Sequence, residues 1–89
     1  MGQTQSDLAD FEAAAEAGDA GALYDLGLSY STGRNGAPND YVVAHKWFNL
    51  AALRGYEAAR VERAEMAELM SEKDIAEAQR LAREWVATH

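Results

Sequence analysis

Cysteine is absent from this chain of 89 residues. A disulfide framework, a thiolate zinc site and a cysteine nucleophile are therefore all excluded. One proline and seven glycines are too few for a collagen-like or low-complexity segment. At this length we expect one small domain over residues 1–89, with a thin margin of stability.

Basic residues are scarce, because 8 Lys and Arg stand against 15 Asp and Glu and give a net charge of −7. Nucleic-acid binding needs clustered Lys and Arg, so we expect no nucleic-acid partner. No apolar run is long enough to cross a membrane and no secretory leader is visible, so we expect no membrane partner and a cytoplasmic location. The first six residues fit the loose pattern for myristoylation of Gly2, and its use stays open.

Leu, Ile, Val and Phe are also few, and alanine carries much of the apolar content. Alanine is the best helix former, and Glu, Arg, Gln and Leu follow closely. Apolar residues recur at spacings of three and four, which is typical of amphipathic helices. The sequence therefore predicts an all-α fold of about five antiparallel helices, over residues 7–17, 20–31, 41–54 and 57–70 and from residue 71 onward.

Short polar residues mark the expected starts of three helices, since Asp19, Asp40 and Ser71 can each act as an N-cap. Gly18 stands where a helix C-terminal glycine belongs. Gly27, in contrast, falls inside a predicted helix, where glycine costs about 1 kcal/mol relative to alanine. Its expected use is to let another helix approach closely.

An internal repeat with a period of 37 residues pairs Phe11 with Phe48 and Ala22 with Ala59. The same offset brings Gly18 onto Gly55, so a helix end, a glycine turn and a helix start recur as a unit. Such a period is typical of helix–turn–helix repeats that stack on one another. We therefore expect a short α-α superhelix, or solenoid.

The residues of the complete unit resemble the Sel-one-like repeat family, a relative of the tetratricopeptide repeats. The match runs through Ala22, Leu26-Gly27, Tyr30, Asp40, Ala44, Trp47, Ala51-Ala52 and Gly55. The loop departs from the family pattern, because it is one residue longer between Gly33 and Gly36 and has Ala37 in place of the usual valine. The resemblance implies a full repeat over residues 19–55. It also implies a partial leading repeat helix over 5–18 and a degenerate C-terminal capping hairpin over 56–88.

Proteins of this family, often bacterial, act as adaptors or scaffolds, so the resemblance implies a non-enzymatic module for protein–protein interaction. The first helices of its hairpins line a concave groove. The candidate partner-binding residues on this groove are Tyr24, Asp25, Leu28, Ser31 and Arg34. Residues 1–40 carry seven acidic residues and one basic residue. The expected partner is therefore a protein or peptide with basic character.

Apolar residues on the outer side of the third predicted helix offer an alternative function. This set comprises Val42, Val43, Leu50 and Leu53. Either neighbouring helices cover these side chains or they form a face for self-association. The second case predicts a structural protein that forms a homodimer, so the chain is expected to be a monomer or a weak homodimer.

Catalytic residues are hard to assemble from this sequence. The histidines are His45 and His89, and neither has a second histidine or a convergent carboxylate set nearby. We therefore expect no enzymatic activity, no metal and no cofactor, with a hydrolase acting through His45 as a remote alternative. His45 is expected to be a structural residue and His89 a frayed end. Trp47 and Trp85 are expected to belong to the core.

Overall fold

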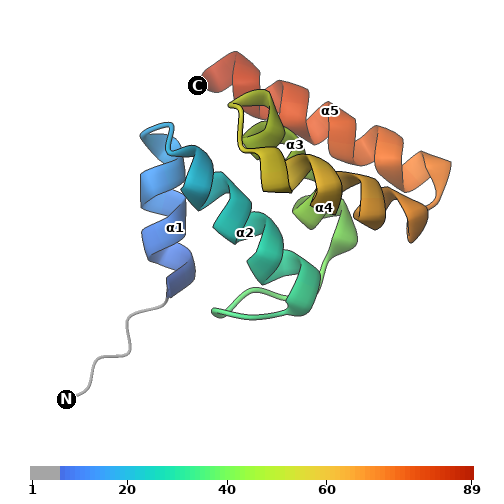
Figure 1. Ribbon diagram of the computed structural model, residues 1–89, viewed down its shortest axis with the longest axis horizontal. Coiled ribbons are helices and arrows are strands. Elements are labelled where there is room, and N and C mark those ends of the chain that lie inside the picture. Colours follow the sequence, from blue (N-terminus) through green and yellow to red (C-terminus); the bar gives the residue numbers. More distant parts are fainter. Residues whose placement is uncertain (1–6) are drawn as a thin grey trace.

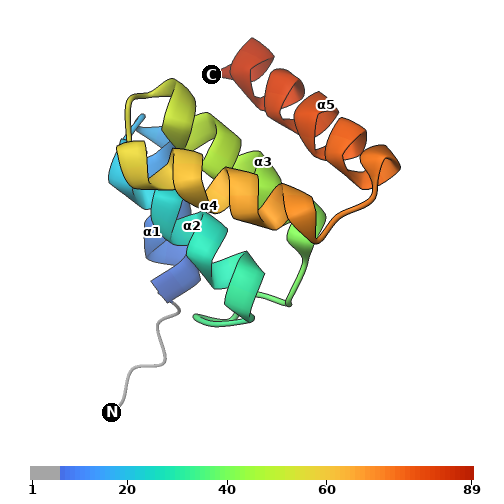
Figure 2. The same ribbon diagram turned by 45° about the vertical axis from the view of Figure 1, so that its right-hand side comes forward.

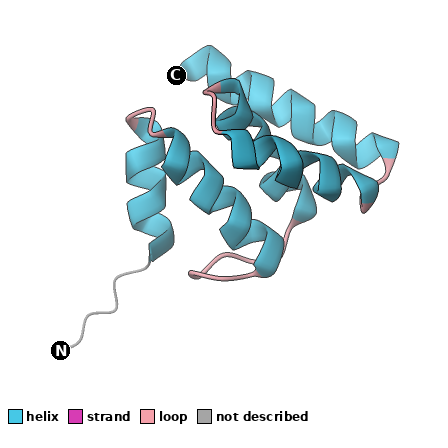
Figure 3. Cartoon of the chain, viewed as in Figure 1, coloured by secondary structure: helices cyan, strands magenta, loops and turns pink. Residues whose placement is uncertain are grey.

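A computed structural model describes residues 7–89, and these residues form five helices and no strand (Figure 3). The myristoylation pattern at Gly2 lies outside the described residues. The helices are α1 (Asp7–Glu16), α2 (Ala20–Thr32), α3 (Tyr41–Leu53), α4 (Glu57–Glu68) and α5 (Glu72–Thr88). The predicted all-α fold is confirmed, and each predicted boundary lies within two residues of the observed one.

The three predicted N-caps are confirmed. The carboxylate of Asp19 accepts hydrogen bonds from the backbone N–H groups of Gly21 and Ala22, at 2.9 and 3.4 Å. Asp40 and Ser71 cap α3 and α5 in the same way, with N···O distances of 3.2 and 3.1 Å. These bonds satisfy backbone donors that the first turn of a helix leaves without a partner.

Helix α3 lies at the centre of the described fold (Figures 1 and 2). It packs against α2, α4 and α5, while α1 packs against α2. Helices α4 and α5 follow each other in sequence, yet each contacts α3 more than it contacts the other. The largest fully buried side chains are Phe48, Leu23, Leu26, Leu50 and Ser29, all from α2 and α3. The core therefore sits mainly between these two helices.

The turns after α1 and α3 have the same hydrogen-bond pattern. Near the end of α1, Gly18 donates to Ala15 at 2.9 Å and Asp19 donates to Ala14 at 3.1 Å. At positions 37 residues later, Gly55 and Tyr56 donate to the equivalent carbonyls at 3.0 and 3.1 Å. Both glycines have positive φ, at 92° and 89°, a conformation that glycine adopts without a steric penalty. The period seen in the sequence is therefore present in the backbone of the two turns.

The C-terminal end of α5 is held against the fold, so the expectation that His89 is frayed was wrong. The imidazole of His89 stacks on the indole of Trp85 with ring centroids 3.8 Å apart. Its Nε2 atom also lies 2.7 Å from Oε1 of Glu16 at the end of α1. Trp85 in turn meets Trp47 edge to face at 6.0 Å, and both indoles are buried as predicted. This aromatic series links α5 to α1 and α3.

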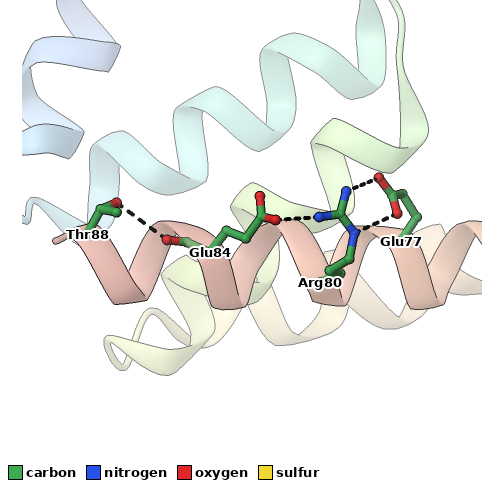
Figure 4. A network of polar contacts seen from close by, with 4 residues as sticks. All are labelled: Glu77, Arg80, Glu84 and Thr88. Carbon is green, nitrogen blue, oxygen red and sulfur yellow. Dashed lines mark hydrogen bonds and ion pairs between the residues drawn. The ribbon is translucent and has the colours of Figure 1, made fainter.

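The outer face of α5 carries an arginine that pairs with two glutamates (Figure 4). The guanidinium of Arg80 donates to Glu77 at 2.6 and 3.0 Å and also bonds to Glu84. The hydrogen bond from Arg80 holds the pKa of the Glu77 carboxyl below its usual value. Because these groups are exposed, solvent screening leaves them a small contribution to stability.

Candidate functional site

Two tyrosines, one on α2 and one directly before α4, form the most distinctive feature of the predicted binding face. Tyr24 is half-buried, and its ring stacks on that of the exposed Tyr56 with centroids 4.7 Å apart and planes at 26°. The Tyr24 hydroxyl donates to Oε2 of Glu62 at 3.4 Å. Tyr56 occupies the N-cap position of α4. The two rings therefore join helices that are not consecutive in the chain.

Carboxylates surround this tyrosine pair. Burial, and then the nearby Asp19 carboxylate, raise the pKa of the half-buried Asp25 above its usual value. Burial and the neighbouring Glu62 likewise raise the pKa of the Tyr24 hydroxyl. We call Tyr24, Asp25, Tyr56 and Glu62 the acidic tyrosine surface. Two partly accessible aromatic rings beside negative charge form an arrangement that favours a cation.

Only part of the predicted binding set belongs to this surface. Leu28 packs partly against the core, and the Ser31 hydroxyl donates to the Leu28 carbonyl of its own helix at 3.1 Å. Arg34 is exposed in the loop beyond the end of α2. Sequence reasoning missed Tyr56 and Glu62. The 37-residue period could have indicated them, because it predicts that α2 and α4 are equivalent helices of successive units.

The predicted self-association face is smaller in the structure than expected. Leu50 is only 2 % exposed and belongs to the core, so its assignment to the outer side was wrong. Val42 and Val43 are half-buried, and only Leu53, at 68 % exposure, is largely accessible. The physical reason is that α3 is packed against α2, α4 and α5, which leaves it little outer surface.

His45 is buried, as expected for a structural residue, with 3 % of its surface exposed. Its Nδ1 atom has no hydrogen-bond partner among the described residues. Burial, and then the positive charge of Arg63, hold the pKa of this imidazole below its usual value. Within residues 7–89, no group of three or more His, Asp or Glu residues is arranged to hold a metal ion.

The stability of the protein is expected to fall as the pH is lowered from about 7.5 to about 5.5, because the folded state disfavours the charged form of His45. The unfolded chain then binds a proton that the folded chain resists, so acid favours unfolding. Thermal melts across this range measure the effect. The His45→Leu variant should lose most of this pH dependence of stability. Both proteins in the comparison should carry His89→Ala, so that the other histidine does not contribute to the pH dependence. An unchanged slope in the His45→Leu variant would contradict this assignment.

Two hollows border α5 on the α3 side of the fold. The first has a volume of about 260 Å³ and is lined by Asn49, Leu53, Ala82, Arg83 and Val86. The second, of about 300 Å³, is lined by Lys46, Leu81, Glu84, Trp85 and Thr88. Of the residues predicted from the sequence to take part in binding or self-association, only Leu53 lines either hollow.

Comparison of the chain with family models, with curated proteins and with solved structures found no match. In the described part of the chain, no helix combines the length and the apolar character needed to span a membrane. The functional assignment therefore depends on the residues and their geometry.

Proposed function

We propose that the chain is a helical-repeat module of the Sel-one-like type that binds another protein and catalyses no reaction. In this proposal α2 and α4 are the first helices of successive units, and α3 and α5 are the second helices of a short superhelix. Two contacts support that order. Tyr24 of α2 meets Tyr56 at the start of α4, and Trp47 of α3 meets Trp85 of α5. Such neighbours are expected when helical hairpins stack.

The observation that carries the proposal is the acidic tyrosine surface on α2 and α4. A lysine or arginine side chain of a partner can lie over the face of a tyrosine ring and pair with Asp25 or Glu62. Tyr24 packs against the core, and Tyr56 stacks on Tyr24. Both rings are therefore ordered before a partner binds. Pre-ordered groups lower the entropic cost of binding. The partner that fits is a basic segment of another protein.

The burial of His45 supports the non-catalytic part of the proposal. A general base must come within hydrogen-bond reach of the substrate, and a ring that is 3 % exposed is not accessible to one. The exposure of the side chains also favours binding of another protein over self-association. Of the apolar residues predicted to form a self-association face, only Leu53 is largely exposed.

The binding prediction can be tested with an array of short peptides of varied sequence. We expect the retained peptides to carry Arg or Lys beside an apolar residue, with affinity that falls as salt is added. Glu62→Gln should weaken binding of such a peptide by about three- to tenfold, because it removes a charge that faces the partner. Tyr24→Ala should weaken it as well, because it removes one of the two stacked rings, and isothermal titration measures each change.

A matched control is Glu68→Gln, which makes the same charge change on an exposed residue of α4. This variant should bind the selected peptide like the wild type. Circular dichroism checks that the Tyr24 variant remains folded. Equal losses in the Glu62 and Glu68 variants would show that only the overall charge matters. Selection of acidic peptides would overturn the proposed partner.

A further inference from the structure

The hollow of about 260 Å³ between α3 and α5 has a lining that is mostly apolar and open to solvent. We call it the α3–α5 pocket, lined by Asn49, Leu53, Ala82, Arg83 and Val86. Leu53 is 68 % exposed and Val86 is 54 % exposed, which makes them two of the more exposed large apolar side chains in residues 7–89. The volume of this pocket is just below the range of pockets that bind drug-sized ligands. It suits one amino-acid side chain and the groups next to it.

The polar groups of the α3–α5 pocket are donors. Arg83 is exposed and forms no ion pair with the described residues. The Oδ1 atom of Asn49 accepts a hydrogen bond from Nη1 of Arg63 at 2.7 Å. Since arginine has only donors, this bond fixes the orientation of the amide and leaves the Asn49 N–H groups to donate. The lining contains one cation and no carboxylate, although the whole chain has a net charge of −7.

The donors lie about one helical turn from the apolar side chains. Asn49 and Leu53 are four residues apart on α3, and Arg83 and Val86 are three residues apart on α5. Residues at these spacings are neighbours on a helix surface. An occupant that contacts both parts must carry a negatively charged acceptor close to an aliphatic group. A single C-terminal residue does so, with its carboxylate and its side chain.

We propose that the α3–α5 pocket binds the C-terminal residue of a partner protein when that residue is aliphatic. Its side chain lies against Leu53, Ala82 and Val86, and its terminal carboxylate accepts from Arg83 and Asn49. This site lies on α3 and α5, whereas the residues of the acidic tyrosine surface belong to α2, α4 and the N-cap of α4, and the two sites select opposite charges. It is independent of the proposed function, so either can fail without the other.

The test uses N-acetyl-leucine and N-acetyl-leucinamide as probes of the isotope-labelled full chain by NMR. The acid carries both groups, and the amide lacks only the charge. We expect the acid to bind with a millimolar dissociation constant, as its size allows, and to shift the amide signals of residues 49–53 and 82–86. The neutral amide should bind about tenfold more weakly, since it lacks the charge-assisted hydrogen bonds.

Variants then assign the two parts of the pocket. Arg83→Gln should reduce binding of the acid to the level of the amide, while Leu53→Ser and Val86→Ser should weaken both probes. Arg60→Gln and Val61→Ser are the matched controls, because both residues are exposed on α4 and do not line the pocket. These controls should bind like the wild type.

Equal binding of the acid and the amide would overturn the proposal, because an internal apolar segment would then fit as well. So would shifts away from residues 49–53 and 82–86, or no shift at about 20 mM acid. Shifts of the same signals with protein concentration alone would assign the pocket to a second copy of the chain and also overturn it.

Discussion

Replacing Gly27 by alanine is expected to lower the free energy of unfolding by about 2 kcal/mol, despite the higher helix propensity of alanine. A Cβ atom built on Gly27 lies 2.5 Å from two ring atoms of Phe48 and 2.9 Å from a third. Phe48 is fully buried, so its ring cannot turn into solvent to make room. Either the ring or the α2–α3 packing has to shift, and the cost exceeds the gain in propensity.

Chemical denaturation of the wild type and the variant measures this loss. Gly21→Ala is the control on the same helix, because its Cβ would lie 3.3 Å from the Asp19 carboxylate and 3.8 Å from Tyr56 and would not meet the core. We expect this control to stay within about 1 kcal/mol of the wild type. A second change, Phe48→Leu, should cost less in the Gly27→Ala protein than in the wild type, since contacting residues are energetically coupled. Similar stabilities of the two alanine variants would show that the close approach is not needed.

The sequence predicted the helices and their ends well because those depend on local groups. Asp19, Asp40 and Ser71 cap helices through bonds to backbone groups two or three residues away. The effect of Gly27 was also predictable in kind, because a glycine inside a helix needs a reason for its cost. No local pattern in the sequence predicted that Phe48 is the residue that packs against Gly27.

The candidate site was predicted less completely because its contacts join distant parts of the chain. Within the site, Tyr24 and Glu62 are 38 residues apart. Outside it, His89 and Glu16, whose contact was also missed, are 73 residues apart. Helix periodicity tells which side chains share a face, but it does not tell which helix covers that face. Leu50 shows the same limit, since it was assigned to the outer side of α3 and lies in the core.

Replacing Trp85 by alanine is expected to have the largest effect, a loss of about 3–5 kcal/mol in the free energy of unfolding. Trp85 is 8 % exposed, meets Trp47 edge to face and carries the His89 ring on its face. Helix α5 packs chiefly against α3 and makes fewer contacts with α4. The indole is therefore the largest side chain that holds α5 in place. Since a domain of this size has a stability on the order of 5–10 kcal/mol, the variant should be marginally folded at best.

Hydrogen exchange distinguishes loss of α5 from uniform weakening. If Trp85 anchors this helix, the amides of residues 72–88 should lose protection more than those of α2 in the Trp85→Ala protein. Trp85→Phe keeps a ring against Trp47 and should retain part of the stability, while Val86→Ala changes an exposed neighbour and should cost less than about 1 kcal/mol. Because Ala82, Arg83 and Val86 all lie on α5, release of this helix should also abolish binding at the α3–α5 pocket. A loss below about 1 kcal/mol in the Trp85→Ala protein, with α5 still protected, would mean that other contacts hold this helix to α3.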